Sequence, residues 1–290
     1  MTTTSRRSDR FVLSNRYQFK GRLVMKTALH IGGGRNSLSP SDSPVVLTAE
    51  GIPFIPGSSF KGALRSTVEK LAPSLSSTFT ACGLVELSNE EINEKLKARE
   101  FVCSTQRQRY FTEQRRNHPE NSEAILEEAL NGRCSICRLF GSPFAAALIN
   151  VNDLYMPPNE QIDIIQIRDG VAIDRDSEKA KDRLKYDFEV VPSTTVFELA
   201  ITLENADEQD VQLACVGLSE FVHGYGAIGG MRSRGLGACI LENLEVSAFE
   251  LTGIDETERN RRLKSFLLNN EFPVKVPGTQ FLQEHIQKIM

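Results

Sequence analysis

The segment Tyr17-Gln-Phe-Lys-Gly-Arg-Leu-Val-Met25 alternates between two kinds of residue. Its odd-numbered positions carry Tyr, Phe, Gly, Leu and Met, whereas its even-numbered positions carry Gln, Lys, Arg and Val. A period of two is typical of a strand with one buried face, because successive side chains point to opposite sides of a sheet. We therefore predict a strand whose outer face is basic, with Lys20 and Arg22 on it.

A helix is predicted after this strand. Gly32-Gly-Gly34 ends the strand, residues 43–47 are a short strand candidate, and the turn-rich residues 50–57 follow. The helix should begin at residue 58 or 59, because apolar residues then recur at helical spacing, at Phe60, Leu64, Val68 and Leu71. Pro73 is expected to end it.

The remaining periodic segments complete a known pattern. They are predicted strands over 145–153, 196–203 and 238–246 and a predicted helix over 211–222. Two interruptions separate them, namely residues 73–140, with one predicted helix over 123–130, and the charged residues 157–192. Without these, the order is strand, helix, strand, strand, helix, strand. That order predicts an α+β protein with a ferredoxin-like core, as in RNA-recognition sheets of the RRM kind.

This pattern divides the chain into four parts. The predicted ferredoxin-like core consists of residues 16–72 and 141–247, and residues 73–140 form an insertion. Residues 157–192, bounded by prolines, are predicted to form a protruding hairpin. The tail, residues 248–290, has one helical stretch over 257–268 and lies outside the core pattern.

The composition fits a globular protein. Of 290 residues, 40% are hydrophobic and 25% charged, and no apolar run is long enough to span a bilayer, so we expect a cytoplasmic protein. The net charge of −4 argues against a nucleic-acid partner, but the distribution of charge matters more. Residues 97–116 contain six basic side chains, two acidic ones and interleaved aromatics. A solvated loop and a nucleic-acid contact both remain open for this segment.

Three glycine-containing segments are candidate ligand-binding motifs. Gly224-Tyr-Gly-Ala-Ile-Gly229 matches the dinucleotide fingerprint, but it follows a helix and precedes a strand, which is the reverse of the required order. Residues 57–62 lack the Gly-Lys-Ser/Thr ending of a phosphate loop. Lys61 and Arg65 share one helical face, where a nearby anion would relieve their repulsion; a solvated helix face is the alternative. Gly229-Gly-Met-Arg-Ser-Arg-Gly-Leu-Gly237 permits close backbone approach and adds two arginine donors; a plain turn is the alternative.

The six cysteines are not read as a disulfide scaffold, because such scaffolds are rare in a reducing compartment. Cys134-Ser-Ile-Cys137 is half of a zinc site, which Cys82 and Cys103 of the same insertion would complete. His118 is the substitute ligand, and buried free thiols are the alternative. Cys215 and Cys239 lie on apolar faces and are predicted core residues.

Five motifs together resemble the RAMP superfamily, and in particular the backbone subunit of type III CRISPR effector complexes. They are Leu29-His-Ile-Gly-Gly-Gly34, Asp42-Ser-Pro-Val45, Ile55-Pro-Gly-Ser-Ser-Phe-Lys-Gly-Ala-Leu-Arg65, Cys137-Arg-Leu-Phe-Gly-Ser142 and residues 229–237. Residues 171–175 and 189–192 are similar to the thumb hairpin of that family. The resemblance covers about residues 17–247, and it implies a subunit that coats guide RNA (crRNA) and cleaves target RNA beside other subunits of the complex.

The resemblance also implies roles for individual residues. The predicted RNA contacts are Lys61, Arg65, Arg232 and Arg234, with Ser58, Ser59, Gly229 and Gly230. The thumb residues that would displace a nucleotide are Val171, Ile173, Asp174 and Arg175. Asp42 stands where active members carry an acidic residue for cutting, so it is the predicted catalytic residue of a metal-dependent endoribonuclease. It would bind magnesium or orient the attacking hydroxyl; a turn cap is the alternative.

Two other functions remain open. One is a structural subunit that binds RNA without cutting it. The other is a guide-processing endonuclease of the same superfamily, for which a histidine would be the general base. The four histidines have no evident partner in the sequence. The long basic insertion and the tail depart from the family pattern, so the sequence leaves open the position of the subunit in a complex.

Overall fold

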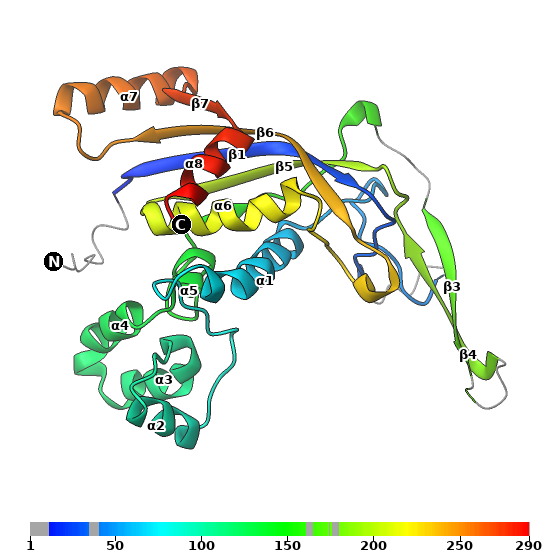
Figure 1. Ribbon diagram of the computed structural model, residues 1–290, viewed down its shortest axis with the longest axis horizontal. Helices are drawn as coiled ribbons and strands as arrows, with labels where there is room; N and C mark the ends of the chain where they lie inside the picture. The colour runs from blue at the N-terminus through cyan, green and yellow to red at the C-terminus, as the bar shows by residue number, and fades with distance from the viewer. Residues whose placement is uncertain (1–11, 35–40, 161–164, 174, 176–179, 290) are drawn as a thin grey trace.

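The structure is a computed structural model that describes residues 12–34, 41–160, 165–173, 175 and 180–289. Its centre is an antiparallel sheet of five strands in the order β2-β5-β1-β6-β7. Strands β5, β1, β6 and β7 of this sheet are labelled in Figure 1. The core elements are β1 (Asn15–Met25), α1 (Gly57–Leu75), β2 (Ile149–Val151), β5 (Val196–Glu204), α6 (Glu208–Val222) and β6 (Cys239–Glu250). The fold is therefore a mixed α+β fold with a ferredoxin-like core, as predicted.

The alternation in β1 has the expected physical basis. Phe19, Leu23 and Met25 are fully buried, whereas Lys20 on the opposite face is exposed. Helices α1 and α6 cover the apolar face of the sheet (Figure 1). Burying such a side chain stabilises the fold by about 1.5–3 kcal/mol, so this face supplies much of the driving force for folding.

Helices α1 and α6 approach each other closely at a glycine. A Cβ atom at Gly217 of α6 would lie 2.5 Å from Val68 and 2.7 Å from Leu64, both on α1. Nearby, the rings of Phe60 and Phe221 lie 5.0 Å apart. The predicted stripe of α1 was correct for Phe60, Leu64 and Val68 but wrong for Leu71, which is only half-buried while the next residue, Ala72, is buried.

Three predicted boundaries were wrong. Residues 43–47 form no strand, only isolated bridges from Val45 to Gly32 and from Leu47 to Pro53. Helix α1 continues past Pro73 to Leu75, since the φ that proline imposes is compatible with a helix. The strand predicted over 145–153 shortens to β2, because the preceding residues bond elsewhere: Leu148 donates to Leu139 O.

The insertion contains more helix than predicted. Its elements are α2 (Asn89–Lys97), η2 (Ser104–Arg107), α3 (Gln108–Asn117), η3 (Pro119–Asn121), α4 (Ser122–Asn131) and α5 (Ser135–Phe140). Helix α2 begins with a capping box, in which Ser88 Oγ accepts from the Glu91 N–H and the Ser88 N–H donates to Glu91. Helices α2 to α4 lie apart from the sheet in Figure 1.

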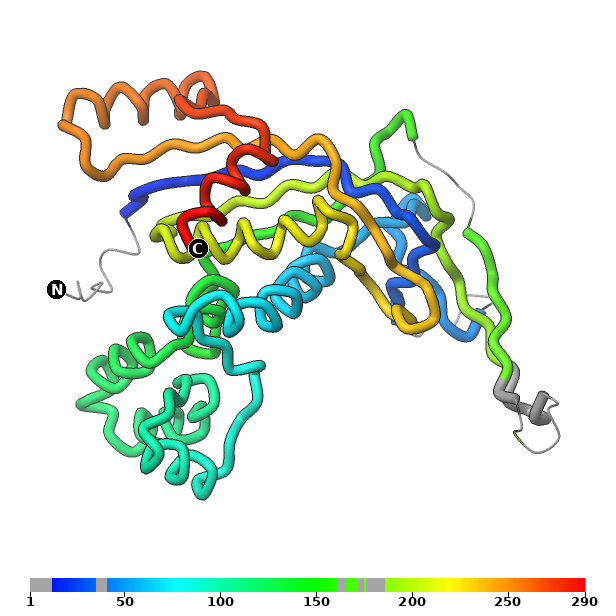
Figure 2. The backbone as a smooth tube through the Cα atoms, viewed as in Figure 1, coloured from blue at the N-terminus to red at the C-terminus, as the bar shows by residue number. Residues whose placement is uncertain are grey.

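A two-stranded hairpin leaves the other end of the sheet. It consists of β3 (Gln166–Ile173) and β4 (Ala180–Val190), preceded by the turn η4 (Pro158–Glu160). Figure 2 shows its backbone running away from the main sheet. The base of the hairpin is tied to the core by two backbone bonds between Leu29 and Val191.

The tail, residues 248–290, comes after the predicted core pattern and packs against the core sheet. After α7 (Glu256–Asn269), strand β7 (Val274–Pro277) pairs with β6 and becomes the fifth strand. Helix α8 (Gly278–Gln287) then packs Phe281 against Tyr17 and Phe19, with ring centroids 6.0 and 5.8 Å apart. Among the described residues, no helix is both long enough and apolar enough to cross a membrane.

Candidate functional site

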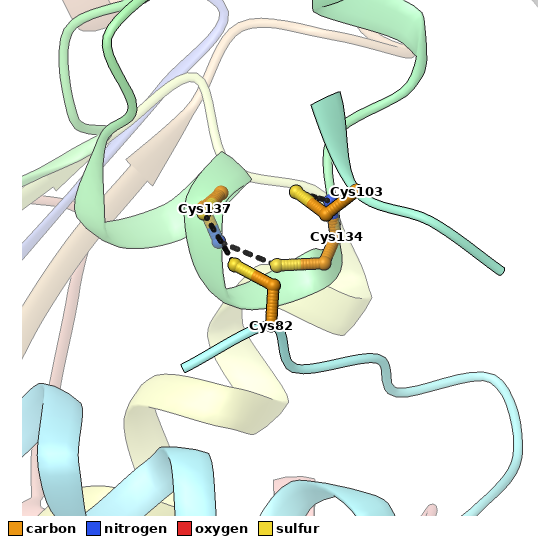
Figure 3. Close-up of side chains that lie close together, drawn as sticks. All are labelled: Cys82, Cys103, Cys134 and Cys137. Carbon is orange, nitrogen blue, oxygen red and sulfur yellow. Dashed lines mark hydrogen bonds between the residues drawn. The ribbon is translucent and has the colours of Figure 1, made fainter. Parts of the chain in front are cut away.

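Four cysteines from three segments of the insertion meet in one buried cluster. Cys82 follows α1, Cys103 precedes η2, and Cys134 and Cys137 lie at the start of α5 (Figure 3). Their sulfur atoms all lie within 4.8 Å of one another, and those of Cys82 and Cys137 are 3.5 Å apart. All four side chains are free thiols, so no disulfide explains their proximity.

The dimensions of the cluster fit a tetrahedral zinc ion. Zinc–sulfur bonds of about 2.3 Å separate the four ligands of a tetrahedron by about 3.8 Å. Backbone N–H groups already donate to the sulfurs: Cys134 to Cys103 Sγ (3.2 Å) and Cys137 to Cys134 Sγ (3.3 Å). Hydrogen bonds from Cys134 and Cys137 lower the pKa of the Cys103 thiol. By contrast, hydrogen bonding to Cys103, together with burial, raises the pKa of the Cys82 and Cys134 thiols. A bound cation would therefore be needed to hold all four cysteines as thiolates.

Arg65 of α1 reaches this cluster. Its guanidinium donates to Cys137 Sγ (3.3 Å), to Gly141 O (3.2 Å) and to Glu69 Oε1 (2.9 Å). Thr105 Oγ1 also donates to Cys137 Sγ, at 3.2 Å. The donors of Arg65 are therefore engaged at the junction of α1 and the insertion, and its predicted contact with RNA stays a prediction.

The start of α1 carries the other predicted anion contacts. The Gly57 N–H, the first helical donor, binds Asp153 Oδ1 at 2.7 Å, so one carboxylate already occupies this helix terminus. Ser58 is exposed and Ser59 half-buried. Burial, with Arg65 nearby, lowers the pKa of Lys61.

Asp42 lies in a loop that packs against β4. Its side chain is exposed, its N–H donates to Asp187 Oδ1 (2.7 Å), and the Asp187 N–H donates to Asp42 Oδ2 (3.2 Å). The neighbouring carboxylate of Glu189 is buried and accepts from the Val45 N–H (3.0 Å) and the Ser41 hydroxyl (3.1 Å). Odd-numbered residues of β4 thus face the loop that carries Asp42.

The glycine-rich segment packs on the other side of β4. Arg232 and Arg234, in the turn η5 (Arg232–Arg234), are exposed, and Arg234 donates to the hydroxyl of Tyr186 on β4. The Gly230 N–H donates to His30 O at 2.9 Å. A Cβ atom at Gly229 would lie 2.3 Å from the same oxygen, and its φ of +84° also favours glycine.

The thumb residues are only partly described. Val171 and Arg175 are exposed, and Ile173 ends β3. Asp174 lies outside the described residues. Strand β4 therefore links three predicted features, namely the hairpin, the loop of Asp42 and the loop of Arg232 and Arg234.

Sequence reasoning missed three residues of this region: Tyr186, Asp187 and Glu189. The sequence placed Glu189 in the hairpin motif without a role. The signal was the alternation of Tyr186-Asp-Phe-Glu-Val190, which indicates a strand with two different faces. The loop partners of Asp187 and Glu189 are about 145 positions away along the chain, and Arg234, the partner of Tyr186, is 48 positions away; periodicity does not reveal such pairs.

A family model, that of the RAMP superfamily, matches residues 22–240, which is more than half of the chain. The matched range includes the core strands from β1 to the start of β6, the cysteine cluster, the hairpin and the glycine-rich loop. No curated protein matches the chain.

Proposed function

Because the chain belongs to the RAMP superfamily, we propose that this CRISPR-associated RNA-binding subunit coats the guide RNA of a type III complex and cleaves complementary target RNA. The observation that carries the proposal is the convergence on β4. Asp42 is bonded to Asp187 on one side of this strand, and Arg234 is bonded to Tyr186 on the other. An exposed carboxylate and exposed arginines thus border the base of one hairpin.

The arginines supply phosphate contacts. Arg232 and Arg234 are exposed and follow a backbone turn rich in glycine, so an RNA backbone has access to both guanidinium groups. Guanidinium groups bind phosphate oxygens through charge-assisted hydrogen bonds that carry no sequence information. Such contacts suit a subunit that must bind guides of any sequence. The net charge of −4 is no obstacle, because only one surface has to face phosphate.

Asp42 is the proposed catalytic residue. Its exposed loop position lets the carboxylate reach a phosphodiester without disturbing the sheet. Asp42 and Asp187 offer oxygen ligands of the kind that magnesium prefers. A bound magnesium ion would stabilise negative charge on the phosphate. Without an ion, Asp42 would instead orient the attacking hydroxyl.

We also propose that the cysteine cluster holds one structural zinc. Support comes from the four buried sulfurs and from the hydrogen bonds that Arg65, Thr105 and backbone N–H groups donate to them. The ion would join the end of α1 to α5 and to the loop between them. Its role would be to fix the insertion on the core, far from the RNA chemistry.

A non-catalytic subunit remains the second candidate, and one observation favours it. The reciprocal bonds between Asp42 and Asp187 secure the loop against β4, a task that needs no chemistry. A guide-processing enzyme finds less support. The candidate base His30 is 6% exposed, and its Nδ1 lies 2.7 Å from Glu189 O.

Asp42→Ala and Asp42→Asn distinguish the two candidates in the assembled complex. Asn keeps the size of the side chain and an oxygen that can accept from the Asp187 N–H, but it removes the charge. We expect both variants to bind target RNA as the parent does and to lose cleavage at the position that this subunit contributes, by about 10²-fold or more. Undiminished cutting by Asp42→Asn would support a purely structural loop.

A further inference from the structure

The loop that carries Asp42 is held by one residue of β4. The carboxylate of Glu189 accepts from the hydroxyl of Ser41 (3.1 Å) and from the N–H of Val45 (3.0 Å). The Glu189 N–H donates to Ser43 O, also at 3.0 Å. These bonds fall on alternate residues, 41, 43 and 45, so they fix the backbone on both sides of Asp42.

A second set of hydrogen bonds, through His30, also joins β4 to this loop. His30 Nδ1 lies 2.7 Å from Glu189 O, and Ser43 Oγ lies 3.3 Å from His30 Nε2. A carbonyl oxygen only accepts, so Nδ1 carries the proton and Nε2 accepts from the hydroxyl of Ser43. The His30 ring also meets Phe188 edge to face, with centroids 5.8 Å apart. The orientation of His30 is therefore fixed by β4.

Burial of the Glu189 carboxylate destabilises the fold unless its hydrogen bonds to the loop are kept. Glu189 is 7% exposed, and a carboxylate removed from water is tolerated only when donors satisfy it. The loop supplies two of these donors, so displacement of the loop would take two hydrogen bonds from the buried carboxylate and the acceptor from the Val45 N–H. The loop should thus keep one position while the side chain of Asp42 remains exposed.

We infer that Glu189 is a positioning residue for cleavage, which acts by holding the Ser41–Val45 loop so that the carboxylate of Asp42 meets the scissile phosphate. The inference rests on the catalytic role proposed for Asp42. It assigns to Glu189 no contact with RNA. It also explains why a charged side chain is buried at the base of a hairpin where an apolar one would pack more simply.

The test compares Glu189→Ala, Glu189→Gln and Asp42→Ala in the assembled complex. Alanine removes the acceptors, whereas glutamine keeps an oxygen for the Val45 N–H and an amide that can donate to Ser41. Since small misplacements of a catalytic group are costly, we expect Glu189→Ala to lower the single-turnover cleavage rate by at least about tenfold. Target binding should stay at the parent's level. Glu189→Gln should restore most of the rate.

Hydrogen exchange supplies a measurement that does not depend on cleavage. The Val45 amide should exchange faster in Glu189→Ala than in the parent, and at nearly the parent's rate in Glu189→Gln. If Glu189→Ala fails to fold, Ser41→Ala removes one donor more gently. It should lower the cleavage rate in the same direction by a smaller factor.

The outcomes separate this inference from the proposed function. Cleavage by Asp42→Ala at the parent's rate would overturn both. An inactive Asp42→Ala together with a fully active, folded Glu189→Ala would overturn only the positioning role. Equal losses in Glu189→Ala and Glu189→Gln would also contradict it, because the amide restores the hydrogen bonds and lacks only the charge.

Discussion

The contacts of Arg65 in the structure differ from the phosphate contact that its sequence position indicated. Its spacing from Lys61 on a helical face indicated a contact with phosphate. In the fold, the two side chains have different surroundings, because Arg65 donates to Cys137 Sγ and Gly141 O. A positive charge beside the cysteine cluster would offset the negative charge that four thiolates would bring to the proposed zinc ion. Arg65 therefore has a structural task whether or not it touches RNA.

Arg65→Ala should weaken the retention of zinc. Loss of a group that supports a metal ligand commonly costs 10–100-fold in metal affinity, so we expect release of zinc to a chromophoric chelator to accelerate by about tenfold. Lys61→Ala is the matched control, since it removes a cation from the same helix face without a bond to sulfur. If Arg65→Ala released zinc at the parent's rate and bound RNA more weakly, Arg65 would be an RNA contact and not a support of the zinc site.

At the scale of elements, hydrophobic periodicity in the sequence predicted the strands and helices of the core. The apolar alternation of β1 and the stripe of α1 determine which faces are buried, so the ferredoxin-like core could be predicted from them. Helix α2 was not predicted from the sequence, although Ser88 and Glu91 have the spacing of a capping box. Strand β7 has only four residues and ends at Pro277, too short for a pattern of period two. Its place is set by pairing with β6.

The candidate site was predictable to a similar extent. Asp42, the arginines and the cysteines stand in local motifs, so the chain itself marks them. The roles of Asp187 and Glu189 depend on contacts between β4 and a loop far away in the chain. Such contacts come from the tertiary fold, and neither composition nor spacing encodes them locally.

The insertion should depend on its metal. We expect purified protein to contain one zinc per chain by elemental analysis, and Cys137→Ser or a strong chelator to remove it. Structural zinc contributes folding energy directly, so residues 74–140 should then become sensitive to protease and lose helix signal. Cys239→Ala, which removes a buried thiol outside the cluster, should leave the zinc content unchanged. Well-folded protein without zinc would rule out the site.

At the scale of the whole molecule, one end of the core holds the insertion and the other end carries the proposed RNA-contacting segments. The cysteine cluster joins the helical insertion to α1, while β4 gathers the loop of Asp42, the hairpin and the glycine-rich loop at the opposite end. On β1, Arg16 pairs with Glu204 and lies over the Phe266 ring of α7, 5.0 Å from its centroid, so it is already engaged within the fold. We therefore propose that RNA crosses the end organised by β4.

The most direct test of this account is the salt dependence of RNA binding by the double variant Arg232→Ala/Arg234→Ala. Each phosphate contact contributes about 0.7 to the slope of log affinity against log salt for a single strand, so the slope should flatten by about 1.4. Guides of unrelated sequence should lose affinity equally. Arg261→Ala/Lys264→Ala, which removes two exposed cations from α7, should bind as the parent does. If the Arg232→Ala/Arg234→Ala protein keeps the parent's affinity and slope at every salt concentration, RNA does not cross this end of the molecule.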